Sequence, residues 1–316
     1  MSQYTVLNSQ DIHSILGSYT DARITSFEIL RGGEENTNYL VDTSSGKYVL
    51  TVSEAKSKNT ALVLAKLLRH LNGAGIKTSN IVQTLDDELI TVWKEKPIIL
   101  KEYIDGNVIS DLSADLLELI GEEMGRLHKV DPPDYLPDVL NYDLGMFLEV
   151  DQYESDESLQ SWFRDMHLYI SGYVSDTLPK SLIHSDLFWN NIVVSPNGKE
   201  GAQRITILDF EEACYYYRIF DVGMAIVGLC SRNRKVDLSK AKSFLRGYQK
   251  EVQLEDEERK ALKPFVVVTA AAIACWRHKQ FNYRHPSPDK KSFYKIMKDL
   301  ADNTIALPDT CLVELL

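Results

Sequence analysis

One stretch of this chain constrains its fold and chemistry more than any other: residues 184–191, His-Ser-Asp-Leu-Phe-Trp-Asn-Asn, followed by an apolar run that ends at Asp209. The pattern His-x-Asp-x-x-x-x-Asn supplies one carboxylate and one amide, and Asp209 supplies a second carboxylate. In phosphoryl transfer with magnesium, one Asp orients and deprotonates the attacking hydroxyl, while an Asn and a later Asp hold metal ions against the nucleotide phosphates. The spacing therefore predicts Asp186 as a catalytic base and Asn191 and Asp209 as metal ligands.

The alternative is that Asp186 and Asn191 are ordinary turn residues, because Asp and Asn favour turns. Their surroundings argue against this interpretation. Apolar runs flank the loop at 182–183 and 192–194, and residues 204–208 have the pattern of a strand that ends just before Asp209. Loop, strand and terminal acid follow each other in the order that kinase-like enzymes use, so the sequence favours the catalytic interpretation.

Five stretches carry a family resemblance: residues 33–41, 48–52, 125–128, 184–191 and 208–210. On these stretches the chain resembles the aminoglycoside phosphotransferase and choline kinase family, and within it the homoserine kinases. The resemblance runs from about Tyr4 to the predicted helix near Trp276. It implies an α+β, two-lobed protein-kinase-like fold with a small β-rich N-lobe and a mainly helical C-lobe. It also implies ATP and Mg²⁺ as cofactors and a small-molecule alcohol as substrate.

The composition excludes several other classes of protein. The chain has 316 residues, 44% of them hydrophobic, which is enough for two lobes. A formal net charge of -11 argues against a nucleic acid or an anionic membrane as partner. The 4 cysteines are far apart and the first residues lack a signal-peptide pattern, so we expect neither zinc nor disulfides and a cytoplasmic location. The longest apolar run, 265–276, is short of the ~20 residues of a membrane helix and predicts a buried core helix. A monomer and a homodimer both remain open.

Hydrophobic periodicity outlines the two lobes. Strands are expected at 24–30, 38–42, 47–52, 88–92 and 97–103, and helices at 60–72, 116–128, 220–229 and 261–282. The sequence Asp-Gly-Asn at 105–107 is a turn signal. We therefore expect a nucleotide-binding lobe with its hinge at 1–104 and a catalytic and acceptor-binding lobe at 105–316.

The connection between the first two predicted strands is the expected phosphate loop. Glycine allows a backbone to approach a ligand closely, and backbone N–H groups can bind phosphate oxygens. The residues assigned to this loop are Gly32, Gly33, Asn36, Thr37 and Asn38. An ordinary turn is the alternative, and the absence of Gly-x-Gly-x-x-Gly disfavours a dinucleotide fold. The segment 101–106 resembles the family's hinge, which implies that the backbone of Glu102 and Ile104 binds adenine.

One departure from the kinase pattern concerns a lysine. Kinases place Lys on the strand after the phosphate loop and pair it with Glu on the next helix. Thr51 stands at the Lys position here, and residues 61–70 contain no acid. The joint loss of both residues suggests a coordinated substitution, because losing one alone would leave a charge unpaired. The homoserine kinases are similar to this chain in having Thr there. Lys101 is a candidate replacement, although it also fits a solvated strand residue. Lys56 and Lys58 are further candidates, but they are expected on the surface.

The acceptor side is less defined by the sequence. The resemblance places Asp221 at the start of a helix that supports the catalytic loop, a role compatible with a helix N-cap. An Arg can form two parallel hydrogen bonds with one carboxylate, which makes it suitable for binding an amino acid acceptor. The residues considered for acceptor binding are Trp189, Glu211, Arg277 and Arg284. The alternatives are a core aromatic residue and ordinary surface ion pairs.

Three interpretations follow. The first is an ATP- and Mg²⁺-dependent phosphotransferase that acts on the hydroxyl of a small molecule, homoserine before others. The second is a kinase for another alcohol, such as choline, ethanolamine, hydroxylysine, a sugar or an aminoglycoside. The third is an inactive kinase-like binding module, which the missing Lys and Glu would suggest. The presence of Asp186, Asn191 and Asp209 argues against the third.

Overall fold

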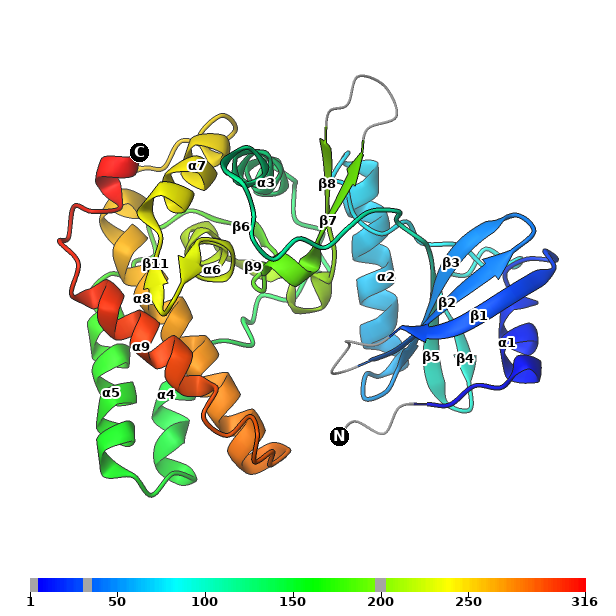
Figure 1. The fold of residues 1–316 in the computed structure, drawn as a ribbon, viewed down its shortest axis with the longest axis horizontal. Coiled ribbons are helices and arrows are strands. Elements are labelled where there is room, and N and C mark those ends of the chain that lie inside the picture. The colour runs from blue at the N-terminus through cyan, green and yellow to red at the C-terminus, as the bar shows by residue number, and fades with distance from the viewer. Residues whose placement is uncertain (1–4, 31–35, 197–202) are drawn as a thin grey trace. The chain divides into compact units, whose positions relative to one another are not determined.

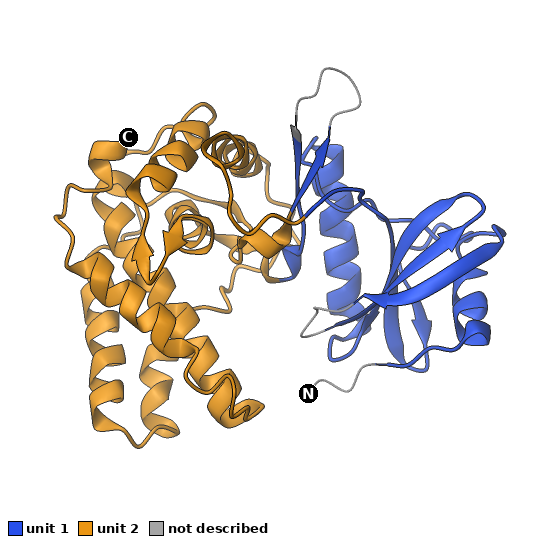
Figure 2. Ribbon diagram, viewed as in Figure 1, with its two compact units in different colours: residues 1–107, 193–211 blue, residues 108–192, 212–316 orange. Residues whose placement is uncertain are grey.

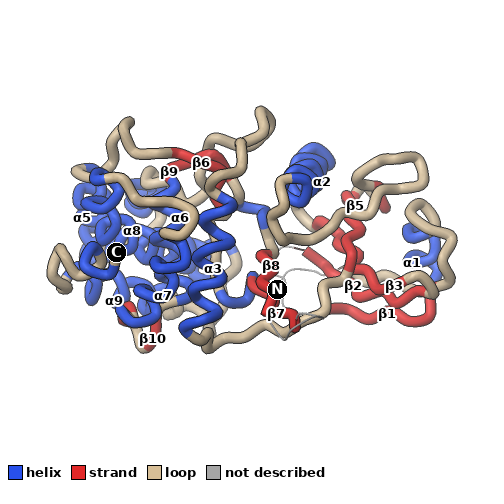
Figure 3. Tube along the Cα trace, turned by 90° about the horizontal axis from the view of Figure 1, so that it is seen from above, coloured by secondary structure: helices blue, strands red, loops and turns tan. Residues whose placement is uncertain are grey.

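The chain folds into two compact units. The structure is a computed structural model and describes residues 5–30, 36–196 and 203–316. Unit 1 consists of residues 1–107 and 193–211, and unit 2 of residues 108–192 and 212–316 (Figure 2). The sequence leads to a single division after residue 104, whereas here a later segment also belongs to unit 1. Most of the strands lie in unit 1, and unit 2 is mainly helical (Figures 1 and 3).

Unit 1 is built on an antiparallel sheet with the strand order β1-β2-β3-β5-β4. Its elements are α1 (Ser9–Leu16), β1 (Ile24–Leu30), β2 (Asn36–Thr43), β3 (Gly46–Ser53), α2 (Lys58–Gly73), β4 (Thr91–Trp93) and β5 (Lys96–Glu102). The later segment adds a separate pair of strands, β7 (Ile192–Pro196) and β8 (Gln203–Ile207). The backbone of Ile207 donates to the backbone oxygen of Lys77 at 2.9 Å, which ties β8 to the chain that follows α2.

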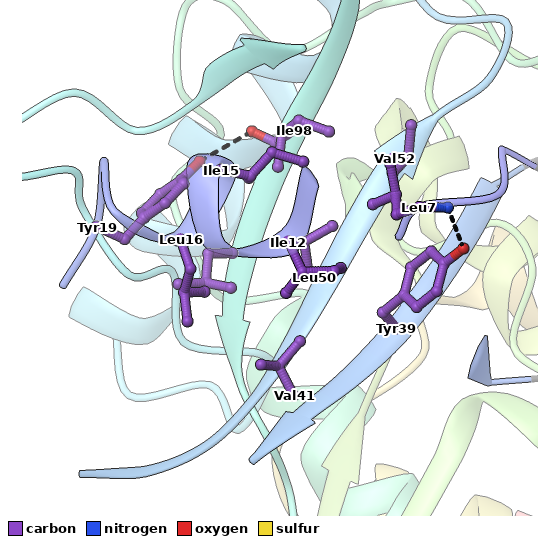
Figure 4. Close-up of a cluster of buried hydrophobic side chains, with 11 residues drawn as sticks. Leu7, Ile12, Ile15, Leu16, Tyr19, Tyr39, Val41, Leu50, Val52 and Ile98 are labelled. Atoms are coloured by element: carbon purple, nitrogen blue, oxygen red, sulfur yellow. Dashed lines mark hydrogen bonds between the residues drawn. The ribbon is translucent and has the colours of Figure 1, made fainter. Parts of the chain in front are cut away.

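The sheet of unit 1 has two different faces because successive side chains of a strand point to opposite sides. In β5, Ile98 and Leu100 pack with α1, whereas Ile99 packs with Ala61 and Ala65 of α2. The cluster on the α1 face contains Leu7, Ile12, Ile15, Leu16, Tyr19, Tyr39, Val41, Leu50, Val52, Ile98 and Leu100 (Figure 4). The residues between these in β2, β3 and β5 therefore share the α2 face.

Unit 2 is a helical assembly with short strands. Its helices are α3 (Ala114–Leu127), α4 (Met146–Glu149), η1 (Val150–Gln152), α5 (Glu157–Ser171), η2 (Trp189–Asn191), α6 (Arg218–Leu229), α7 (Leu238–Tyr248), α8 (Asp256–Lys279), the π-helical η4 (Gln280–Arg284), α9 (Tyr294–Ile305) and η5 (Val313–Leu315). The short 3-10 helix η3 (Phe210–Glu212) lies where the chain enters this unit. Strand β6 (Lys180–Ile183) pairs with β9 (Cys214–Tyr217), and β10 (Ser231–Arg232) pairs with β11 (Lys235–Val236).

Helix α8 forms the core of unit 2. All residues from Ala261 to Cys275 are buried, and α6 and α9 pack against this helix. The predicted buried helix at 265–276 is thus confirmed. Helices α3 and α7 approach so closely that a Cβ on Gly247 would lie 1.9 Å from the carbonyl oxygen of Glu118. Only a residue without a side chain permits this contact.

The strand predicted at 88–92 exists but begins three residues later than expected. Strand β4 begins at Thr91, and Leu89 and Ile90 are buried against α2 without pairing in the sheet. Their apolar character therefore reflects packing and not strand formation. The other strands and helices predicted from periodicity are confirmed to within a few residues. All four cysteines are buried free thiols. Within the described ranges, no helix combines the length and the apolarity that a membrane span requires.

Candidate active site

The loop that carries Asp186 follows strand β6 and is held by one buried carboxylate in unit 2. Asp221, in the first turn of α6, accepts the backbone N–H of His184 at 2.8 Å and that of Ser185 at 2.7 Å. Ser185 has a φ of 64°, a left-handed conformation that is costly for a residue with a side chain. Its hydroxyl donates to the backbone oxygen of Glu212 at 2.6 Å. These three hydrogen bonds stabilise the strained turn before Asp186.

Asp221 belongs to a buried polar chain. Its carboxylate lies 3.1 Å from Nε2 of His128, whose Nδ1 lies 2.8 Å from the hydroxyl of Tyr248. Burial alone would raise the pKa of Asp221, but the hydrogen bonds from His128 and from the backbone of His184 lower it below its usual value. The residue is not a helix N-cap, because Tyr217 holds that position. The carboxylate of Asp221 therefore serves the catalytic loop and not the end of its own helix.

Asp186 and Asn191 lie in one loop and are joined directly. The side-chain nitrogen of Asn191 donates to the backbone oxygen of Asp186 at 2.9 Å. This fixes the amide, so that its oxygen, which lies 3.2 Å from the side-chain nitrogen of Asn190, is the end suited to a cation. The backbone N–H of Asp186 donates to Nδ1 of His184 at 3.2 Å, which assigns the proton of this ring to Nε2.

Helix α6 supports the same loop by close contact. A Cβ on Gly228 would lie 2.3 Å from the backbone oxygen of Leu187 and 3.1 Å from Cα of Phe188. Real Cβ atoms do not approach backbone this closely, so glycine is required here. The loop that carries Asp186 thus rests on bare helix backbone at Gly228 and on the Asp221 carboxylate, which lies about two turns earlier in the helix.

Asp209 lies in unit 1, two residues after the end of β8. It is exposed and has a φ of 64°, so it adopts the left-handed conformation like Ser185. Residues other than glycine rarely adopt the left-handed conformation. Those that do are enriched at functional sites. The strand β8 therefore presents this carboxylate at a turn, as the sequence predicts.

One polar strip crosses the α2 face of the sheet in unit 1. Asn38 in β2 is opposite Thr51 in β3, which is opposite Ile99 in β5, and Lys101 comes two residues after Ile99. The Thr51 hydroxyl donates to the side-chain oxygen of Asn38 at 2.7 Å. Thr51 is 3% exposed, so at the position of the kinase lysine the chain has a buried cross-strand hydrogen bond instead of a charge.

Glu211 is the centre of a charged cluster in unit 1. Its carboxylate is ion-paired with Lys56 and accepts a hydrogen bond from the side-chain nitrogen of Asn36 at 2.5 Å. Burial lowers the pKa of Lys101, while the nearby carboxylates of Glu211 and Asp209 oppose that effect. The cluster brings two amines and two carboxylates together on the same face as Thr51.

Two expectations change in the light of this cluster. The side chain of Lys56 is only 17% exposed, so its description as a surface lysine is wrong. The carboxylate that draws it inward lies 155 residues away along the chain and is invisible to a local pattern. Glu211 was considered for acceptor binding, but its partners here are Lys56 and Asn36.

The remaining nucleotide candidates differ in their placement. Thr37 faces the α1 side, where its hydroxyl donates to Glu54, so its side chain does not join the polar strip. Glu102 donates its backbone N–H to the backbone oxygen of Asn80 at 2.9 Å, which leaves its carbonyl as the group suited to a base. Ile104 lines a pocket of about 520 Å³ in unit 1. Gly32 and Gly33 lie outside the described residues.

A second pocket, of about 280 Å³, lies within unit 2. Its lining residues are Asn141, Asp143, Gly145, Met146, Glu149, Trp276, Lys279, Gln280 and Arg284. The pocket contains two acids and two bases, and Lys279 donates to Glu149 at 2.6 Å. Asn141 donates to the carboxylate of Glu212, whose backbone oxygen accepts from Ser185. A short chain of hydrogen bonds therefore links this pocket to the catalytic loop.

Of the residues considered for acceptor binding, Arg284 alone lines this pocket. Arg277 and Trp189 are not among its lining residues, and Trp189 is 39% exposed in η2. Asn141 and Asp143 were not predicted from the sequence, because they come from a segment without helical or strand periodicity. The Asn, Asp and Gly residues of that segment have only the signature of a loop.

The chain belongs to the phosphotransferase enzyme family, whose family model matches residues 26–265. It is 25% identical over 301 residues to the homoserine kinase of Zymomonas mobilis subsp. mobilis, covering 92% of this chain and 91% of that one. It is also 25% identical over 316 residues to the homoserine kinase of Neisseria meningitidis serogroup B, covering 93% and 96%. These findings confirm the family resemblance.

The fold is protein-kinase-like, as a solved structure also shows. Amicoumacin kinase hAmiN, in complex with AMP-PNP, Ca²⁺ and Ami, matches with a TM-score of 0.74 at 17% sequence identity, covering 94% of each chain. Together with the family match, this makes the protein a small-molecule kinase. The prediction of an enzyme that transfers a phosphoryl group is thereby confirmed.

Proposed function

We propose that the protein transfers the γ-phosphoryl group of ATP to the side-chain hydroxyl of homoserine. The observation that carries this proposal is the small pocket of unit 2, which holds acids and bases together. An amino acid such as homoserine brings one ammonium and one carboxylate, so it needs both kinds of partner. The carboxylates of Asp143 and Glu149 suit the ammonium, and the amine of Lys279 and the guanidinium of Arg284 suit the carboxylate.

The pocket is also of a size that suits a small acceptor. Its volume of about 280 Å³ lies just below the range for ligand pockets, roughly 300 to 1,000 Å³. Trp276 and Met146 contribute apolar walls that can contact the methylene groups of the acceptor. The homoserine kinases that cover more than nine tenths of this chain support the same acceptor.

On the catalytic side, Asp186 is the proposed general base that accepts the proton of the acceptor hydroxyl. It directly follows a strained turn held by Asp221, which fixes the main chain just before this carboxylate. Positioning of this kind is a main source of rate in phosphoryl transfer, since the protein does little covalent chemistry there.

The donor groups of the chain suit a magnesium nucleotide. Asn191 and Asp209 offer oxygen atoms, which Mg²⁺ prefers, and this ion commonly binds through one or two protein oxygens together with substrate phosphates. When bound, Mg²⁺ supplies neutralisation of the phosphate charge. Lys56 and Lys101 are the proposed cationic partners of the nucleotide in unit 1, in place of the kinase lysine. The AMP-PNP in the similar amicoumacin kinase supports an adenine nucleotide as donor.

The decisive experiment compares homoserine with 3-aminopropanol, its decarboxylated counterpart, under ATP and Mg²⁺. A pocket that pairs Arg284 with the acceptor carboxylate leaves that arginine without its partner when the carboxylate is missing. Such polar mismatches cost up to roughly 10⁴-fold in kcat/KM. Equal kcat/KM values for the two compounds, or a preference for choline or an aminoglycoside, would contradict the homoserine proposal and leave the kinase assignment intact.

Arg284→Ala provides the matched variant for this comparison. We expect it to raise the KM for homoserine and to leave the kinetics with 3-aminopropanol close to those of the wild type.

A reducing cytoplasm is the proposed place of action, because all four cysteines are free thiols.

A further inference from the structure

We propose that Glu154 is a positioning residue for the acceptor. Through His278 and Tyr283 it fixes the π-helical turn Gln280–Arg284, whose first and last residues line the small pocket of unit 2. This inference rests on the proposed function, since it takes that pocket as the acceptor site. It adds a residue that lies outside the pocket and decides the direction of one that lies inside it.

The π-helical turn is an unusual end for a helix. Helix α8 ends at Lys279, and the backbone N–H of His285 then donates to the backbone oxygen of Gln280 at 2.8 Å, five residues earlier. Turns of this type are rare and frequently occur at functional sites. If the turn relaxed to an α-helix, the residues at its C-terminal end, including Arg284, would move by one position in register. That shift rotates a side chain by about 100° around the helix axis and would turn Arg284 away from the pocket.

The carboxylate of Glu154 is fully engaged on both oxygens. One oxygen accepts from Nε2 of His278 at 2.6 Å and from the Tyr283 hydroxyl at 3.0 Å. The other accepts the backbone N–H groups of Ser155 at 2.7 Å and Asp156 at 2.9 Å. The side chains of His278 and Glu154 are 5% and 9% exposed, so solvent does not readily replace these contacts.

The protonation states agree with this geometry. Burial lowers the pKa of His278, so the ring is neutral and donates from Nε2. Its Nδ1 lies 3.3 Å from the side-chain nitrogen of Asn282, a donor that suits a ring nitrogen without a proton. Asn282 also donates to the backbone oxygens of His278 and Lys291, both at 3.1 Å. The turn is therefore fastened at its start by His278 and in its middle by Asn282 and Tyr283.

The first test is the kinetics of Glu154→Gln. Glutamine keeps the size of the side chain. It replaces the carboxylate by a neutral amide, which has only one oxygen to accept the four hydrogen bonds that the carboxylate accepts. We expect the KM for the acceptor to rise about tenfold, while kcat and the KM for ATP stay within about twofold of the wild type. Asp151→Asn is the matched control, because Asp151 lies in the same connection and pairs with Arg164 at 2.8 Å. We expect this control to behave as the wild type.

Tyr283→Phe is the second variant and removes one hydroxyl from a side chain that is 41% exposed, which does not threaten the fold. It should raise the acceptor KM in the same direction by a smaller factor. In an Arg284→Ala background, Glu154→Gln should add little, because residues that act through one another are not additive. The proposal would be overturned if the KM for ATP rose as much as the KM for the acceptor, or if the acceptor KM were unchanged in both Glu154→Gln and Tyr283→Phe. Full additivity of Glu154→Gln and Arg284→Ala would overturn it as well.

Hydrogen exchange separates this inference from the proposed function. We expect Glu154→Gln to accelerate exchange of the backbone amides of residues 280–285 without any acceptor present, and Asp151→Asn to leave it unchanged. Unchanged exchange in Glu154→Gln would overturn the positioning role whatever the acceptor is. Failure of the proposed function would show instead as a wild-type enzyme that prefers another alcohol, and the KM comparison would then use that alcohol.

Discussion

Lys56 and Glu211 form an ion pair that joins the chain after strand β3 to the chain after Asp209. Both residues belong to unit 1, and their side chains are 17% and 15% exposed. A kinase usually places a lysine within β3 and a glutamate on the following helix. Thr51 is expected at the place of that lysine, and α2 contains no acid, whereas Lys56 and Glu211 pair from other positions in unit 1. A partly buried pair of this kind depends on both partners, because the loss of one leaves the other charge unpaired.

We expect Lys56→Met to raise the KM for ATP by about tenfold, since the variant removes a cation from the charged cluster around Glu211. Lys58→Met is the matched control, because Lys58 is exposed at the start of α2 and lies two residues away. The measurement is steady-state kinetics with ATP as the varied substrate. If the two lysine variants changed the KM for ATP to the same extent, the role given to the ion pair would be wrong.

Substitution of Lys101 should change ATP binding, whereas substitution of Thr51 should change the stability of the fold. Lys101→Met removes an amine that lies near Glu211 and Asp209, so we expect a higher KM for ATP. Thr51→Ala removes a buried hydrogen bond to Asn38, so we expect a stability loss of about 1 kcal/mol with nearly normal ATP kinetics. Urea unfolding and ATP titrations distinguish the two. Normal ATP kinetics for Lys101→Met would reduce Lys101 to a strand residue.

Asp186→Asn should lower kcat by roughly a hundred- to ten-thousand-fold, the range that general-base assistance provides. Nucleotide binding should survive, because Asn keeps the shape of the side chain and the loop is held by Asp221 through backbone groups. Asp209→Asn should instead weaken the Mg²⁺ dependence of nucleotide binding. Fluorescence titration of the nucleotide at varied Mg²⁺, beside turnover, tests both. An Asp186→Asn enzyme with wild-type turnover would remove the base assignment.

Much of the fold follows from local patterns in the sequence. Strand β1 has the bounds that alternation predicts, and α8 was expected from an apolar run too short for a membrane. The predictions that failed concern residues whose role is decided by tertiary packing. Leu89 and Ile90 are apolar because α2 covers them, and no local rule distinguishes such residues from a strand. The helices α5, α7 and α9 were not predicted, although each has an apolar face.

In the candidate site, too, local patterns were predicted from the sequence and long-range contacts were not. The His-x-Asp-x-x-x-x-Asn spacing is local and predicts that Asp186 and Asn191 act together, and the structure joins the two residues by a hydrogen bond. The partner of Lys56 lies 155 residues away, so its burial could not be read from the residues around it. Asp221 fits an N-cap by sequence, but α6 begins three residues earlier and frees the carboxylate for the loop. Long-range pairing, and not propensity, decides these roles.

Gly228→Ala should lower kcat while leaving nucleotide affinity unchanged. The new Cβ would lie 2.3 Å from the backbone oxygen of Leu187, so either α6 or the catalytic loop must move. A displacement of about 1 Å at catalytic groups costs up to roughly a hundredfold in rate. Gly172→Ala is the control in the same unit, because its Cβ meets nothing closer than 3.9 Å. Equal turnover of the two variants would show that the loop tolerates the shift.

Acid should destabilise unit 1 through Glu54. Burial raises the pKa of this carboxyl, but hydrogen bonds from Lys96, Thr37 and Thr5 outweigh that effect and lower it from the usual 4.5 to about 2. Because the folded pKa lies below the unfolded one, the stabilisation is fully present above about pH 4.5 and is lost as the pH falls toward 2. We expect Glu54→Gln to be less stable at pH 7 and to show a flatter acid dependence in urea unfolding between pH 5 and pH 2. Parallel curves for the variant and the wild type over that window would show that Glu54 does not carry the effect.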